Sequence, residues 1–306
     1  MAEPTATGRD DEAPGYDQRV FVPDGPDMLV RHYGDPNGTP VLMLHGTPGS
    51  RFKFSSTDET ARKLHLHIIA PDRWSYGGTA APADPSLEKF AQWAGAAMAA
   101  LGYDRFAVGG ISGGAPYATA VAALLPERVI AAALISPVGL VADAEAAREV
   151  DAFHRFCFDH LPKSPRSIAA IFRLYEIAVR RAPSLAARLT VLRAPKPDKL
   201  IMADPGTRAR LLRTFAEGLR ESARGPSIDL ALFREIATLE LGRIVAPTHV
   251  WIGTRDTNVP VTAAKRLASR IPNATLTVLP DEGHLWAAKH YDEILAWVAE
   301  AVRPNG

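Results

Sequence analysis

Cysteine is almost absent from this chain, and so are long apolar runs and an excess of charge of one sign. Because Cys157 is the single cysteine, no disulfide can form within the chain, and we expect a reducing compartment, the cytoplasm. No stretch approaches the roughly 20 apolar residues of a membrane span, so no membrane partner is expected. The net charge is +1 and no basic run is interleaved with aromatics, which argues against a nucleic-acid partner.

Residues 1–15 are polar and rich in Pro and Gly, without the apolar stretch of a signal peptide, and we expect a disordered tail. Beyond it, in 16–138 and 243–306, short apolar runs alternate with longer helical patterns, which is typical of a mostly parallel sheet with helices on both faces. Eight strands are predicted, at 20–22, 28–33, 41–44, 68–70, 106–109, 131–135, 249–252 and 276–279. The turn residues at 23–26 predict that the first two strands form an antiparallel hairpin.

The alternation stops between residues 139 and 242, where helical patterns are punctuated by prolines and no strand is evident. We predict an inserted helical cap over the carboxyl ends of the strands, where open α/β sheets bind ligands. This segment holds 17 Lys and Arg against 13 Asp and Glu. The surplus could attract acidic substrates, but we favour a solvated surface with arginine stems packed on apolar neighbours.

A candidate nucleophile lies in residues 110–114, which read G-I-S-G-G. An apolar run precedes Ser112 and an alanine-rich helical pattern follows it, so strand, sharp turn and helix would expose its hydroxyl at the end of a strand. The helix start supplies free N–H groups and a positive dipole end, which suit a developing oxyanion. The pattern therefore predicts a nucleophilic serine rather than an ordinary glycine-rich turn.

A serine hydroxyl needs a base, and the base needs an orienting acid. Asp256 and His284 each follow a predicted strand, so both are expected at the same sheet edge as Ser112. Taken singly, Asp256 could fix its own turn and His284 could be a packed loop residue. Together with Ser112 they favour a catalytic triad.

Acyl transfer also needs two donors for the oxyanion. The N–H of Gly113, directly after the nucleophile, is one candidate, and the N–H of Thr47, in the loop after the strand at 41–44, is the other. His45 in the same loop is expected to hold backbone through hydrogen bonds rather than to act as a base.

Five stretches carry a resemblance to a known family: 45–49 (HGTPG), 71–78 (PDRWSYGG), 110–114 (GISGG), 253–260 (GTRDTNVP) and 283–284 (GH). With them in this order, the chain resembles α/β-hydrolase fold enzymes of the group that includes esterases, non-haem haloperoxidases and proline iminopeptidases. The resemblance covers about 20–137 and 243–302 and implies that fold. One departure is visible, because relatives often carry D-R-P-G-x-G where this chain has Trp74 and Ser75.

The leading hypothesis is a cofactor-free and metal-free serine hydrolase that cleaves a small, apolar carboxylic ester or lactone through an acyl-enzyme on Ser112. Alternatives are proline iminopeptidase-like, carbon–carbon bond hydrolase and haloperoxidase- or perhydrolase-like activities, or a small-ligand receptor or non-hydrolytic tailoring enzyme. Trp74, Trp286, Phe153 and Phe156 are candidate substrate-binding residues, although aromatics at the spacing seen in the cap are often core. The sequence is also compatible with a homo-oligomer.

Overall fold

The computed structural model describes residues 14–142 and 152–303. Most of the predicted tail, residues 143–151 of the predicted cap and residues 304–306 lie outside the described residues. Eight strands form one sheet in the order β1-β2-β4-β3-β5-β6-β7-β8. They are β1 Tyr16–Val20, β2 Met28–Gly34, β3 Thr39–Leu44, β4 Leu66–Pro71, β5 Phe106–Ile111, β6 Val129–Ile135, β7 Thr248–Gly253 and β8 Ala274–Leu279. All neighbouring pairs are parallel except β1 with β2 and β2 with β4, which confirms the mostly parallel sheet.

The first strand lies earlier than predicted. Residues 20–22 were expected to form it because they are apolar, but β1 is Tyr16–Val20, and Phe21 and Val22 lie outside any strand. Strand β1 is an edge strand, mostly exposed and polar, so its sequence carries little hydrophobic signal. The predicted hairpin is confirmed, since β1 pairs antiparallel with β2 and Val20 lies opposite Met28.

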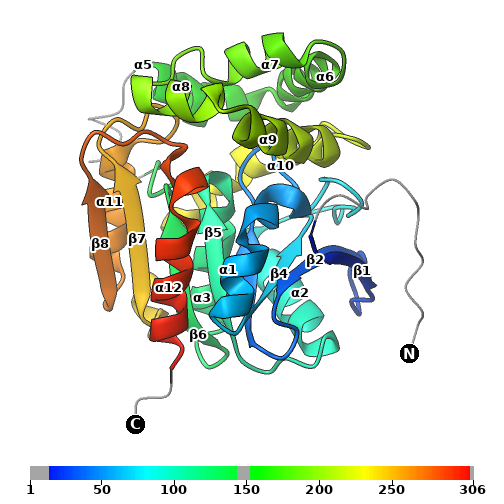
Figure 1. Cartoon of the computed structure of the whole chain (residues 1–306). Helices are drawn as coiled ribbons and strands as arrows, with labels where there is room; N and C mark the ends of the chain where they lie inside the picture. Colours follow the sequence, from blue (N-terminus) through cyan, green and yellow to red (C-terminus); the bar gives the residue numbers. More distant parts are fainter. Residues whose placement is uncertain (1–13, 143–151, 304–306) are drawn as a thin grey trace.

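Helices cover both faces of the sheet (Figure 1). Successive apolar residues of each buried strand alternate between the faces: in β3, Leu42 and Leu44 join one core cluster, while Val41 and Met43 join the other. The first cluster includes residues of α2 (Leu87–Ala100), α3 (Ala115–Leu124) and α11 (Val261–Arg270). The second includes residues of η1 (Arg51–Thr57), α1 (Asp58–Lys63), η7 (Trp286–Lys289) and α12 (Tyr291–Ala301).

Between β6 and β7 the described chain is helical, and these helices lie over the end of the sheet (Figure 1). They are α5 Ala152–Arg155, η3 Phe156–His160, η4 Leu161–Lys163, α6 Pro165–Arg181, α7 Pro183–Thr190, α8 Lys196–Ala203, α9 Pro205–Gly218, α10 Gly225–Leu232, η5 Phe233–Thr238 and η6 Leu241–Arg243. Several of the prolines that punctuate this sequence stand at the first or second position of a helix, where the missing N–H costs nothing. Within 14–142 and 152–303, no helix is both long and apolar enough to cross a bilayer.

Candidate active site

Ser112 lies on the turn between the buried strand β5 and η2 (Ser112–Gly114), which leads into α3. Its φ of +54° is unusual for a residue with a side chain, and such strain is held only where the surrounding structure enforces it. Gly110 makes the turn sterically feasible, because a Cβ there would approach the carbonyl oxygen of Gly114 to 2.5 Å. The turn leaves Ser112 half-buried at the carboxyl end of the strand, as its sequence context predicts.

A chain of two hydrogen bonds joins the three residues that the sequence singled out. Ser112 Oγ lies 2.9 Å from His284 Nε2, and His284 Nδ1 lies 2.7 Å from Asp256 Oδ2. Ser112 and His284 are 172 positions apart in sequence, and His284 and Asp256 are 28 apart. The fold therefore brings an alcohol, an imidazole and a carboxylate into line at one edge of the sheet.

The two carboxylate oxygens of Asp256 have separate roles. Oδ1 accepts hydrogen bonds from the backbone N–H groups of Asn258 (2.9 Å) and Val259 (3.1 Å), which fixes the turn after β7. Oδ2 is left to face the imidazole of His284. The two interpretations of Asp256, turn residue and triad acid, are thus compatible, because each uses a different oxygen.

A second carboxylate, which the sequence did not reveal, holds the loop that carries His284. Asp198, in α8 of the helical insertion, accepts hydrogen bonds from the backbone N–H of His284 and of Leu285, both at 2.9 Å. The Asp198 side chain is buried, at 1% exposure. The insertion therefore holds the main chain that carries the imidazole.

The charges around His284 set its protonation. Burial by itself lowers its pKa, but Asp256, through charge and hydrogen bond, and Asp198, through charge, outweigh burial and hold the pKa above its ordinary value. Lys53 in η1 acts in the opposite direction. Burial lowers the pKa of Lys53 itself to about 8. Burial raises the pKa of Asp198, although its two backbone hydrogen bonds oppose that change.

The raised pKa of His284 predicts how the activity falls at low pH. The imidazole must be neutral to accept a proton, so kcat/KM is expected to fall as the pH drops through the raised His284 pKa, at a pH above the usual value of about 6.5. Asp198→Asn removes one negative charge that raises this pKa, so we expect the acid limb to move down by about half to one pH unit. Plateau kcat/KM should also fall by about two- to tenfold, because one backbone N–H loses its acceptor.

The measurement is a pH profile of kcat/KM for a neutral aryl ester. Glu221→Gln is the matched control, because Glu221 is an exposed acid of the same insertion, paired only with Arg220 among the described residues. An Asp198→Asn profile that coincides with that of Glu221→Gln would contradict a role for Asp198 at His284.

The loop after β3 lies directly against Ser112. A Cβ at Gly46 would lie 3.3 Å from Ser112 Cβ, and a Cβ at Gly113 would clash with the Thr47 side chain. His45 is buried and neutral: its Nδ1 lies 2.8 Å from Gly46 O, and its Nε2 accepts the N–H of Arg73 at 3.1 Å. Burial and the charge of Arg73 hold the His45 pKa well below its ordinary value. His45 thus makes the backbone contacts that were expected of it.

A buried charge cluster supports this loop from the far side. Asp229 of α10 receives Arg73 Nη1 at 2.5 Å on Oδ1 and Arg73 Nη2 at 2.8 Å on Oδ2. The hydroxyls of Tyr76 and Tyr117 donate to it at 2.6 Å each, and that of Thr47 also donates to it. Arg73 in turn donates to the carbonyl groups of residues 45 and 46. Asp229 is fully buried, and one insertion carboxylate therefore fixes both the loop and the guanidinium beneath it.

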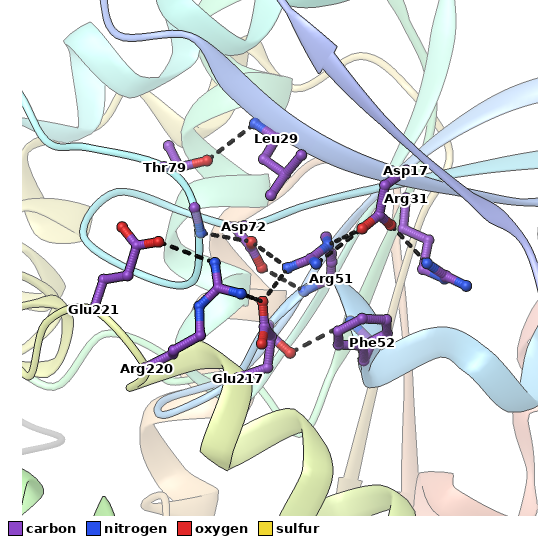
Figure 2. A network of polar contacts seen from close by, with 12 residues as sticks. Asp17, Leu29, Arg31, Arg51, Phe52, Asp72, Thr79, Glu217, Arg220 and Glu221 are labelled. Atoms are coloured by element: carbon purple, nitrogen blue, oxygen red, sulfur yellow. Dashed lines mark hydrogen bonds and ion pairs between the residues drawn. The ribbon is translucent and has the colours of Figure 1, made fainter. Parts of the chain in front are cut away.

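A second ionic network ties the insertion to the core at the carboxyl end of α9 (Figure 2). Arg51, at the start of η1, contacts Asp72 at 2.8 Å, Asp17 of β1 at 2.9 Å and Glu217 of α9 at 2.6 Å. Burial raises the pKa of Asp72 to about 6, although Arg51 opposes the change. In Figure 2, Arg51 lies between Asp17, Asp72 and Glu217, so one side chain joins three segments distant in sequence.

No cluster of three or more His, Cys, Asp or Glu residues able to hold a metal ion occurs within 14–142 and 152–303.

A family model of the alpha/beta hydrolase fold matches residues 39–289, most of the chain and all three members of the hydrogen-bonded chain. The protein belongs to the α/β hydrolase fold family. Among curated proteins, this α/β hydrolase is similar to Lipase 1 of Psychrobacter immobilis, with 23% identity over 280 residues, 88% of this chain and 78% of that protein. It is also similar to 2-hydroxymuconate semialdehyde hydrolase of Pseudomonas putida, with 26% identity and 86% of each chain covered.

Solved structures agree on the fold. An alpha/beta hydrolase fold protein from Nakamurella multipartita superposes with a TM-score of 0.71 at 26% identity, covering 95% of this chain and 100% of that one. The enol-lactonase from Burkholderia xenovorans superposes with a TM-score of 0.68 at 17% identity, covering 93% and 99%. Family membership and these relatives identify the α/β hydrolase as a hydrolytic enzyme.

The two tryptophans expected to bind substrate are buried in the α/β hydrolase. Trp74 is 2% exposed and packs on Phe90 and Trp93 of α2, in the core rather than at an open entrance. Trp286 is equally buried, and its Nε1 donates to Ser136 Oγ at 2.9 Å. Both indoles are large apolar groups that complete the packing beneath the loops, which accounts for their position.

The two phenylalanines expected to bind substrate lie in α5 and η3. Phe156 is 52% exposed, and Phe153 lies beneath the guanidinium of Arg193, 3.6 Å from the ring centre. The ring of Phe233 in η5 lies next to Gly113, the residue after Ser112, because a Cβ at Gly113 would come 2.8 Å from its Cζ. Nothing in the sequence distinguishes Phe233 from the other aromatics of the segment.

Proposed function

We propose that the protein hydrolyses a carboxylic ester or lactone through an acyl-enzyme on Ser112. The observation that carries the proposal is the hydrogen-bonded line from Ser112 Oγ through His284 to Asp256 Oδ2. A hydroxyl, an imidazole and a carboxylate in this order activate a serine for attack on a carbonyl carbon.

In the first half-reaction, His284 Nε2 takes the proton of Ser112 as Oγ bonds to the substrate carbonyl carbon. The imidazolium that forms is stabilised by Asp256 at Nδ1, and it then gives its proton to the leaving alcohol oxygen. In the second half-reaction, His284 takes a proton from water, whose oxygen attacks the acyl carbon. The imidazolium then returns this proton to Ser112 Oγ as the bond from Oγ to the acyl carbon breaks and the acid leaves. The raised His284 pKa suits an imidazole that must gain a proton during each attack.

The carbonyl oxygen becomes negative in both half-reactions and needs donors placed in advance. We assign the N–H groups of Gly113 and Thr47 to this role. In support, Gly113 begins the helical segment after Ser112, and the Thr47 side chain lies against Gly113. Arg73 and Asp229 would keep the Thr47 loop in place during turnover. Each donor is expected to contribute about 2.7–4 kcal/mol to transition-state stabilisation.

The helical segment at 139–242 is proposed to be the cap that closes this site, with Phe233 beside the acyl group. Two of its carboxylates, Asp198 and Asp229, already hold the loops that carry the imidazole and the oxyanion donors. The relatives named as lipases and as an enol-lactonase support ester or lactone chemistry. The relative named as a semialdehyde hydrolase represents a different substrate class, so a semialdehyde of that kind belongs in the activity panel as the alternative to esters and lactones.

A fluorophosphonate that reacts with activated serines tests the proposal. We expect one phosphonyl group per chain, on the peptide that contains Ser112, together with loss of aryl ester turnover in proportion to labelling; intact-mass and peptide mass spectrometry measure both. Pre-incubation with a slow ester substrate should protect Ser112. Absence of labelling at pH 8, or labelling without any ester or lactone turnover, would instead favour a receptor or a non-hydrolytic enzyme.

A further inference from the structure

The surface of the helical insertion farthest from the sheet is unusually apolar for an exposed face. Helices α6, α7 and α8 form this outer layer (Figure 1), and we call the exposed residues of 165–200 the outer cap face. It carries seven of the twelve large apolar side chains that are exposed in the described chain. They are Ile171, Leu174, Ile177, Leu185, Leu189, Leu192 and Leu200, with exposed fractions from 40% to 70%.

These side chains are not scattered, because they recur at regular spacings that form stripes along two helices. On α6, Ile171, Leu174 and Ile177 recur every three residues, and Leu185, Leu189 and Leu192 recur at four and three residues along and just beyond α7. Such spacings place each set along one side of a helix. Both helices bury other residues against the molecule, among them Ile168 and Ala186, so the outward stripes are not needed for packing within the chain.

The charges on the same face are all of one sign. Its exposed ionisable residues are Arg166, Arg173, Arg180, Arg181, Arg188, Arg193, Lys196 and Lys199. The two acids of 165–200, Glu176 and Asp198, are 4% and 1% exposed: Glu176 is paired with Arg173 and Arg180, and Asp198 holds the histidine loop. Eight exposed cations thus accompany the apolar side chains of 165–200, and two of them, Arg173 and Arg180, are paired with Glu176. The next exposed acid along the chain is Asp204, directly after α8.

A groove at the edge of the outer cap face adds Arg208 of α9 to these cations. It lies between α7 and α8, has a volume of about 310 Å³, and is lined by Arg188, Lys199 and Arg208 together with Val191 and Met202. Cations and apolar side chains in one groove match a group that joins an anionic head to a hydrocarbon chain.

We propose that the outer cap face docks on an anionic lipid bilayer, with its leucine and isoleucine side chains entering the headgroup boundary and its cations near lipid phosphates. Helices with an apolar side and a Lys- and Arg-rich rim bind membrane surfaces in this way and need no spanning segment. A second copy of the chain fits less well, because a two-fold interface would set the same eight cations against one another. The expectation of no membrane partner rested on the lack of a span, which surface docking does not require.

Vesicle flotation of the full chain provides the test. We expect binding to vesicles of phosphatidylcholine mixed equally with phosphatidylglycerol, little binding to phosphatidylcholine alone, and weaker binding as salt rises. Arg181→Ser, Lys196→Ser and Lys199→Ser combined should lower partition to the mixed vesicles by about 100-fold, at about fivefold per cation. Leu174→Ser, Leu189→Ser and Leu192→Ser combined should lower it by at least about tenfold at both low and high salt.

The matched control removes three cations at the opposite end of the molecule. Arg105, Arg270 and Arg303 are exposed and lie before β5, at the end of α11 and just after α12, so Arg105→Ser, Arg270→Ser and Arg303→Ser give the same net charge change away from the insertion. This control should keep vesicle binding within about threefold of the wild type. Circular dichroism melting and turnover of a short water-soluble ester should be the same in all three variants, which separates loss of docking from loss of fold or of catalysis.

Four outcomes would overturn the proposal. Equal binding to neutral and anionic vesicles would remove the role of charge, and equal loss in the control variant would remove the assignment to this face. A dimer in light scattering that the leucine variant dissolves, without vesicle binding, would assign the face to a second copy. Binding to polyglutamate but not to vesicles would assign it to an acidic protein. Vesicle binding is measured without substrate, so the result does not depend on ester hydrolysis.

Discussion

Ser112→Ala is expected to lower kcat/KM for an aryl ester by about 10⁴- to 10⁶-fold. The variant loses the atom that bonds to the acyl carbon, whereas the imidazole and its carboxylate keep their places. The folded state should be retained, because alanine removes one half-buried oxygen atom. Steady-state kinetics with the purified variant, and circular dichroism for folding, measure the two effects separately.

Ser136→Ala is the matched control, because Ser136 also follows a strand, β6, and also has a positive φ, +42°. Its hydroxyl accepts a hydrogen bond from Trp286 and does not contact His284 in the described structure. We expect ester turnover within about threefold of the wild type and a loss of about 1–3 kcal/mol in the free energy of unfolding, from the buried indole N–H left without its partner. Comparable loss of turnover in both variants would contradict the nucleophile assignment.

Asp229→Leu is expected to reduce the free energy of unfolding by about 3–5 kcal/mol, the largest stability effect anticipated for a single change in this chain. The Arg73 guanidinium would stay buried without its carboxylate, and the hydroxyls of Tyr76, Tyr117 and Thr47 would lose their acceptor. Burial lowers the pKa of Arg73, and Asp229 more than restores it, so the pair depends on both members. Urea unfolding followed by fluorescence measures the loss.

A double variant separates the unpaired charge from the lost hydrogen bonds. In Arg73→Met with Asp229→Leu no charge is left buried, so we expect a smaller loss of unfolding free energy than in Asp229→Leu alone. Ester turnover should stay low in both variants, because the loop of Thr47 has lost its support. If Asp229→Leu fails to fold, Asp229→Asn provides the milder comparison. A double variant no more stable than Asp229→Leu would contradict the burial argument.

The sequence predicts those parts of the site that depend on local pattern. Ser112, Asp256 and His284 each follow a buried strand, and parallel strands carry their trailing residues to the same edge, so local context alone brings them together. Seven of the eight strands were located within three residues at either end for the same reason, since each is a run of apolar residues between turns. The eighth, β1, is polar and exposed and gives no such signal.

The sequence does not predict contacts that depend on how the insertion folds back on the core. Asp198 and Asp229 lie 86 and 182 residues from their partners at His284 and Thr47, and no periodicity relates them. The sequence signal that was available is a lone acid within an otherwise apolar helical stretch, as in 225–232, which suggests a buried partner. Trp74 was expected at the pocket from its position in the 71–78 stretch. Sequence position does not say which side of its loop an indole faces, and this one packs on Phe90.

The carboxylates of α8 and α10 limit how this enzyme can be recombined with its relatives. A cap without acids at these two positions would leave Arg73 and the two amides at residues 284 and 285 without their partners, and the loops around Ser112 would lose support. We therefore expect the substrate range of this enzyme to be easier to alter by changing single residues next to Gly113, such as Phe233, than by exchanging the whole segment. Chimaeras should retain activity only when Asp198 and Asp229 are carried over with their helices.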